Sequence, residues 1–149
     1  MSKKHEKFLT TIGCMDGRVQ EVVAEFGRKK FGAEFPDTIT EAGLVGKLAR
    51  LQLPSQSDGG QAQENPDQAL LDSIKNKLDI SLDKHHSRGI VVHGHQECAG
   101  NPVEDGRHKD DIQKSVQQIK SLINYAVLVV GVFVKRSSQD PSKWEIEEV

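Results

Sequence analysis

Two short segments, far apart in the chain, carry the residue types that bind transition metals. Residues 14–18 read Cys-Met-Asp-Gly-Arg, residues 94–98 read Gly-His-Gln-Glu-Cys, and between them they hold the only two cysteines. Thiolate sulfur and imidazole nitrogen are preferred zinc ligands, and three protein ligands with an open fourth position are typical of a catalytic zinc site. We therefore predict that Cys14, His95 and Cys98 bind Zn²⁺, provided that the fold brings them together.

Asp16 and Arg18 lie beside the first of these ligands and have several possible roles. The Asp16 carboxylate could occupy the fourth metal position, orient a metal-bound water, or cap the helix that follows. The Arg18 guanidinium, two residues on, could hold that carboxylate in a charge-assisted pair and so compete with the metal for it. The sequence leaves these roles open.

Each metal-binding segment follows a short apolar run that is typical of a buried strand. Residues 8–12 are apolar or β-branched, and Ile90-Val91-Val92-His93 precedes Gly94. Further strands are predicted over 35–40, 126–134 and 144–147. Helices are predicted from 19 to about 30, ended by Gly32, from Pro66 onward, ended by residues 87–89, and from Asp110 or Asp111 to 123, because their apolar residues recur every three or four positions. The polar stretch from Pro54 to Pro66 is predicted to be a surface loop, either a plain connector or a lid.

The alternation of strands and helices predicts the α/β fold class. We expect one domain over residues 1–149, built on a mostly parallel central sheet of four strands in the order 2-1-3-4, with an antiparallel fifth strand and helices on both faces. In such sheets ligands bind at the carboxyl ends of the strands, where the strand order reverses. Cys14 and His95 both follow such ends, so the strand positions favour the same site as the residue types do.

The composition restricts the class of partner. Charged residues make up 28% of the 149 residues, and 20 Lys and Arg against 22 Asp and Glu give a net charge of −2. No run of like charge is long enough to form a nucleic-acid-binding patch. The longest apolar run, 126–134, is far shorter than the roughly 20 residues needed to cross a bilayer. We expect a cytoplasmic protein with no nucleic-acid or membrane partner, whose cysteines are reduced thiols or ligands.

The two segments resemble the Cys-x-Asp-Ser-Arg and Gly-His-x-x-Cys signatures of the β-class carbonic anhydrases, and Glu41-Ala42-Gly43 resembles a segment after the second strand of that family. The resemblance implies that Cys14, His95 and Cys98 bind zinc and that Asp16 and Arg18 form a dyad. It also implies that a zinc-bound hydroxide converts carbon dioxide to bicarbonate and that the chain forms a homodimer or higher homo-oligomer. Gly17 stands where the family usually has serine. The chain also begins almost directly at the first strand, so we expect no counterpart of the family's N-terminal helical arm.

Three functions are consistent with these residues. The first is the reversible hydration of carbon dioxide. The second keeps the zinc hydroxide but acts on carbonyl sulfide or carbon disulfide, and the third is a zinc-binding module without catalysis. Of the other histidines, we expect His93 to be a core or supporting residue, and we place His108 in a polar loop.

Overall fold

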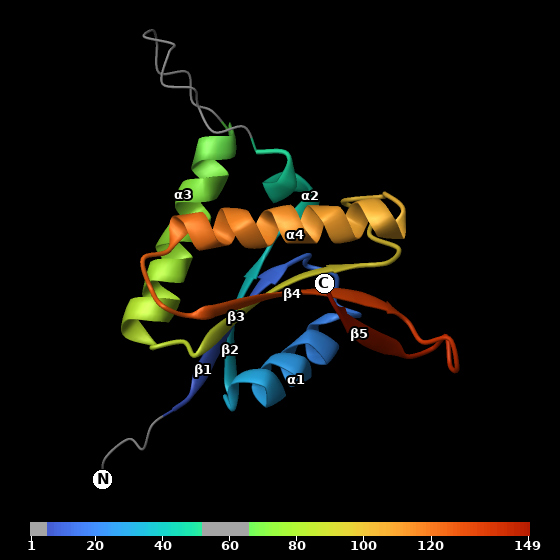
Figure 1. Cartoon of the computed structure of the whole chain (residues 1–149), viewed down its shortest axis with the longest axis horizontal. Helices are drawn as coiled ribbons and strands as arrows, with labels where there is room; N and C mark the ends of the chain where they lie inside the picture. The colour runs from blue at the N-terminus through green and yellow to red at the C-terminus, as the bar shows by residue number, and fades with distance from the viewer. Residues whose placement is uncertain (1–5, 52–65) are drawn as a thin grey trace, which may run out of the picture.

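In the part of the chain that the structure describes, five strands form a single sheet in the order β2-β1-β3-β4-β5 (Figure 1). The computed structural model describes residues 6–51 and 66–149. The first four strands run parallel, and β5 pairs antiparallel with β4. Their bounds are Phe8–Gly13 (β1), Phe35–Thr40 (β2), Gly89–His95 (β3), Leu128–Arg136 (β4) and Trp144–Glu148 (β5).

Helices cover both faces of this sheet. Helix α1 (Gln20–Phe31) lies on one face, and α2 (Leu44–Ala49), α3 (Pro66–Asp79) and α4 (Asp105–Leu122) lie on the other (Figure 1). A π-helical turn, η1 (Ile80–Lys84), continues α3. Apolar side chains that alternate along β3 divide between the two layers: Val91 packs with the α1 side, while Ile90 and Val92 belong to the larger core beneath α2, α3 and α4. This alternation is what a strand buried on both faces requires.

The predicted fold class and strand order are confirmed, and so is the end of the first helix at Gly32, which adopts a left-handed φ of 60°. Helix α2 was not predicted, because its six residues are too few to show a helical period. Strand β4 begins and ends two residues later than the predicted 126–134. The loop predicted from Pro54 to Pro66 lies, apart from Pro66, outside the described residues. Within the described part of the chain, no helix is long and apolar enough to cross a membrane.

The start of the last helix was predicted wrongly. Helix α4 begins at Asp105, not at Asp110 or Asp111, and Glu104 is its N-cap residue. His108 therefore lies inside α4 and is buried, rather than in a polar loop. It occupies the space left by the missing side chain of Gly94, where an added Cβ would lie 2.6 Å from His108 Nε2. The signal that identifies it is its position four residues before Ile112, on the same helical face.

Candidate metal centre

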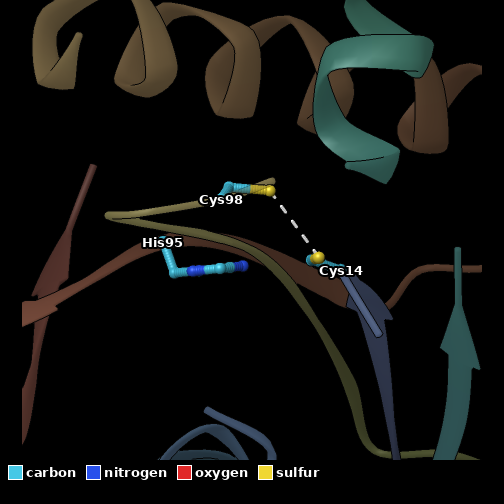
Figure 2. Close-up of side chains that lie close together, drawn as sticks. All are labelled: Cys14, His95 and Cys98. Carbon is cyan, nitrogen blue, oxygen red and sulfur yellow. Dashed lines mark hydrogen bonds between the residues drawn. The ribbon is translucent and has the colours of Figure 1, made fainter. Parts of the chain in front are cut away.

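The sheet brings the two metal-binding segments together. Cys14 follows β1 directly, His95 is the last residue of β3, and Cys98 lies in the turn after it. Strands β1 and β3 are parallel neighbours with Gly13 opposite His93, so their carboxyl ends meet at one edge. The ligand atoms of the three side chains, all buried, lie within 4.8 Å of one another. Figure 2 shows the two thiols facing each other and the imidazole of His95 directed toward them.

The distance between the two sulfur atoms fits a metal centre. Cys14 Sγ and Cys98 Sγ lie 3.7 Å apart. A tetrahedral zinc ion bonded to two sulfurs at about 2.3 Å places those sulfurs about 3.8 Å from each other. The thiols are free cysteines rather than a disulfide. Their separation is therefore close to the one that a shared zinc ion requires.

The His95 side chain presents one ring nitrogen to this position. The residue is fully buried, and its Nδ1 donates a hydrogen bond to the carbonyl oxygen of Gln96 over 2.6 Å. That bond places the proton on Nδ1 and leaves a lone pair on Nε2, which is the arrangement of metal-binding histidines. Among the described residues, Nε2 has no hydrogen-bond partner. A buried acceptor without a partner is costly, and a metal ion would satisfy it.

The two thiols differ in their readiness to ionise. Burial raises the pKa of Cys14, but the adjacent His95 side chain and the backbone amides of Gly43 and Asp16 outweigh burial and lower that pKa to about 6. Burial and the neighbouring Cys14 sulfur raise the pKa of Cys98. In the metal-free protein Cys98 thus donates its S–H to a Cys14 thiolate. Because a thiolate is the form that binds metal, the lowered pKa suits Cys14 to metal binding near neutral pH.

Gly43 holds Cys14 in place through a close approach of two backbone segments. Its N–H donates to Cys14 Sγ over 3.4 Å, and its φ is 61°, in the left-handed region that favours glycine. A Cβ on Gly43 would overlap the carbonyl group of Gly100, two residues after Cys98. The Gly43 loop therefore touches both cysteine segments. The sequence drew attention to Gly43 only through a resemblance, and nothing in the residues themselves indicated this contact.

The Arg18 guanidinium engages both carboxylate oxygens of Asp16. Arg18 Nη2 lies 2.8 Å from Asp16 Oδ2, Arg18 Nε lies 3.1 Å from Oδ1, and the Arg18 backbone amide donates to Oδ1 over 2.9 Å. The Arg18 hydrogen bonds hold the pKa of Asp16 at about 2. No side chain of the described residues caps the N-terminus of helix α1, so Asp16 does not serve as its cap. Asp16 Oδ2 also lies 3.9 Å from His95 Nε2, and the carboxylate therefore borders the position that a metal would take.

Other residues near the centre play supporting parts. His93 is fully buried, as expected, and burial together with the nearby His95 lowers its pKa to about 3, so it is neutral. Gln20 donates from Nε2 to the carbonyl oxygens of Cys14 and Asp16, both over 2.8 Å, and so fixes the first segment. The sequence did not single out Gln20, because only the folded turn brings its amide to those carbonyls.

Comparison with known proteins identifies the family. The model of the family described as "Putative carbonic anhydrase" matches residues 4–149. A comparison with curated protein sequences returned no match.

Among solved structures, the chain is similar to the β-carbonic anhydrase CafA of the fungal pathogen Aspergillus fumigatus, with 13% identity, a TM-score of 0.46, and coverage of 97% of this chain and 76% of that one. It is also similar to two creatininase variants, with 14% and 15% identity, TM-scores of 0.35 and 0.34, and coverage of 85% of this chain and 51% of each of theirs. All three TM-scores lie below 0.5, so the assignment rests on the family match and on the two sequence segments. The chain belongs to this carbonic anhydrase family.

Proposed function

We propose that this protein is a zinc enzyme that reversibly hydrates carbon dioxide to bicarbonate, with Cys14, His95 and Cys98 as the zinc ligands. The observation that carries the proposal is the buried Cys-His-Cys cluster next to an ion-paired carboxylate, in a chain of the carbonic anhydrase family. A zinc ion at this position would lower the pKa of a bound water and supply hydroxide at moderate pH. Two thiolate ligands donate more charge than imidazoles do, so we expect a weaker Lewis acid than in a site with three histidines.

The residues of the chain account for what such a reaction needs beyond the metal. Asp16 stays ionised, because Arg18 holds its pKa at about 2. An ionised carboxylate accepts a hydrogen bond and thereby orients a nucleophile that still carries one proton. Arg18 also keeps both oxygens of Asp16 occupied, which opposes direct binding of the carboxylate to the metal. The dyad thus distinguishes a catalytic centre from a site that only stores zinc.

The substitution Arg18→Ala tests this function. We expect the variant to retain one zinc per chain and to lose hydration activity, because Asp16 is then free to bind the metal. Arg88→Ala is the matched control, since Arg88 is an exposed arginine at the opposite end of β3 whose Nη1 donates to Gly32 O over 2.8 Å. Zinc content by mass spectrometry and stopped-flow hydration rates at pH 7 and pH 9 give the two readouts.

Three outcomes would contradict the proposal. Wild-type protein that holds stoichiometric zinc but does not hydrate carbon dioxide above the buffer rate at either pH refutes the reaction. Sulfide release from carbonyl sulfide or carbon disulfide by that same protein points to the second electrophile. Protein that takes up no zinc after reconstitution refutes the metal site itself.

As for quaternary structure and location, we propose a cytoplasmic homodimer or higher homo-oligomer. Light scattering tests the oligomeric state, and cell fractionation tests the location.

A further inference from the structure

Arg18 has a second set of contacts, with residues other than Asp16. The carboxylate of Glu97 lies between two guanidinium groups: Arg136 donates to it from Nε over 2.9 Å and from Nη2 over 3.2 Å, and Arg18 Nη1 lies 3.5 Å from Oε1. The Glu97 carbonyl oxygen also accepts a bond from Arg18 Nη2 over 3.3 Å. Glu97 adopts a φ of 58°, which is uncommon outside glycine and brings its main chain toward Arg18.

Trp144 lies beneath both guanidinium groups. It is the first residue of β5 and pairs in register with Arg136 of β4. The Arg136 guanidinium carbon lies 4.0 Å from the centre of the indole, and that of Arg18 lies 5.3 Å from it, both within the range of cation–π attraction. The same indole and the His95 ring meet at an interplanar angle of 83°, with ring centres 6.3 Å apart. One aromatic ring therefore contacts Arg18 and a predicted zinc ligand.

These contacts tie the turn after β3 to the end of β4. Gln96 Oε1 accepts the backbone N–H of Arg136 over 2.8 Å, and the Gln96 backbone amide donates to Val134 O over 2.9 Å. The turn that carries Glu97 and the strand end that carries Arg136 are thus joined by the bonds of Gln96 as well as by the Glu97–Arg136 ion pair. The Arg18 side chain, by contrast, is 44% exposed and begins in a loop. Without support it would exchange among solvated rotamers, because a long exposed side chain loses entropy when it is held in one geometry.

We propose that Glu97, Arg136 and Trp144 are positioning residues for Arg18, and through it for Asp16. We name these three residues the arginine seat. The seat fixes the guanidinium in the orientation that occupies both oxygens of Asp16 and so keeps the carboxylate paired beside the metal position. Loss of the seat loosens Arg18 and lets Asp16 turn toward the metal. The catalytic part of this inference rests on the proposed carbon dioxide hydration, whereas the positioning part does not.

The positioning part is tested in metal-free protein by nuclear magnetic resonance. The Arg18 Nε–H bonds to Asp16, so its signal should exchange slowly with solvent, and loss of the signal in Arg18→Lys assigns it. Trp144→Leu removes the ring and Glu97→Gln removes the charge. We expect either change to speed Arg18 Nε–H exchange by about 3-fold to 30-fold, the range of one cation–π or ionic contact. Trp144→Phe, which keeps an aromatic face, should restore most of the protection.

Lys135→Met is the matched control. Lys135 precedes Arg136 in β4 and pairs with Glu147 of β5 over 3.1 Å, so the substitution also removes a cation and an ion pair between β4 and β5. It touches no part of the arginine seat, and Arg18 exchange should stay at the wild-type rate. Glu97 is half exposed in a turn, so we expect Glu97→Gln to fold. This variant tests the positioning of Arg18 if Trp144→Leu fails to fold.

The catalytic part is tested with zinc-loaded protein. We expect Trp144→Leu and Glu97→Gln to lower kcat by about 3-fold to 30-fold at unchanged KM and full zinc content, since the seat contacts no substrate. Wild-type exchange rates in both variants would overturn the positioning role. Faster exchange with unchanged kcat would overturn the catalytic role. Wild-type protein inactive with zinc bound would refute the proposed hydration alone, because the exchange measurement does not depend on it.

Discussion

Substituting Gly43 with alanine should disturb the candidate metal centre, although Gly43 is not itself a proposed ligand. Gly43 has a φ of 61°, and its N–H donates to Cys14 Sγ. A Cβ at this position would overlap the carbonyl carbon and oxygen of Gly100 and lie 2.9 Å from the backbone nitrogen of Asn101. All these atoms belong to the backbone, so no side-chain rotation can relieve the overlap. The Cys98 turn must move away from Cys14, or the Gly43 loop must move away from both.

Two effects should reduce the free energy of unfolding of Gly43→Ala. A left-handed conformation costs a residue with a Cβ about 1–2 kcal/mol. Overpacking against fixed neighbours adds about 1–3 kcal/mol. We therefore expect Gly43→Ala to reduce the free energy of unfolding by about 2–5 kcal/mol, a large fraction of the roughly 5–15 kcal/mol that stabilises a typical domain. Zinc affinity should fall as well, because the distance between the two sulfurs is no longer held.

Urea unfolding of the metal-free protein measures the first effect, and competition with a chromophoric zinc chelator measures the second. Gly17→Ala is the matched control, since a Cβ there would meet no atom of the described residues within 4 Å, although Gly17 lies between Asp16 and Arg18. We expect that control to change the free energy of unfolding by less than about 0.5 kcal/mol. A Gly43→Ala variant within about 1 kcal/mol of wild type and with unchanged zinc affinity would show that the loop yields freely.

Two further predictions concern the metal ligands and an ion pair on the surface. Cys98→Ser should fold but lose most of its bound zinc, because a neutral hydroxyl is a poor substitute for a thiolate, and full zinc occupancy in this variant would argue against the proposed ligand set. Lys109 lies 2.6 Å from Glu147 and holds the pKa of that carboxyl below its usual 4.5. The ion pair therefore stabilises the fold above pH 4.5, and this contribution is lost as the pH falls through the lowered pKa. A carboxyl titration followed by nuclear magnetic resonance should show a higher pKa of Glu147 in Lys109→Gln than in the wild type. An unchanged Glu147 pKa would mean that the ion pair does not form in solution.

The sequence by itself was enough to predict the sheet order and the convergence of the three side chains that could hold a metal ion. Strand and helix periods alternate clearly along the chain, and parallel strands have their carboxyl ends at one edge, so Cys14 and His95 had to converge once β1 and β3 were neighbours. The pairing of Asp16 with Arg18 could also be anticipated, because the two residues are separated by a single glycine and their charges attract.

The tertiary structure alone decided which residues surround that cluster. Arg136 and Trp144 reach Arg18 from strands more than a hundred residues away, and their contact depends on the antiparallel register of β4 and β5. The bond from Gly43 to Cys14 depends on a backbone conformation that no periodicity reveals. Local patterns in a sequence report which face of an element is buried, but the contacts that tune a site come from the packing of distant elements, which those patterns do not encode.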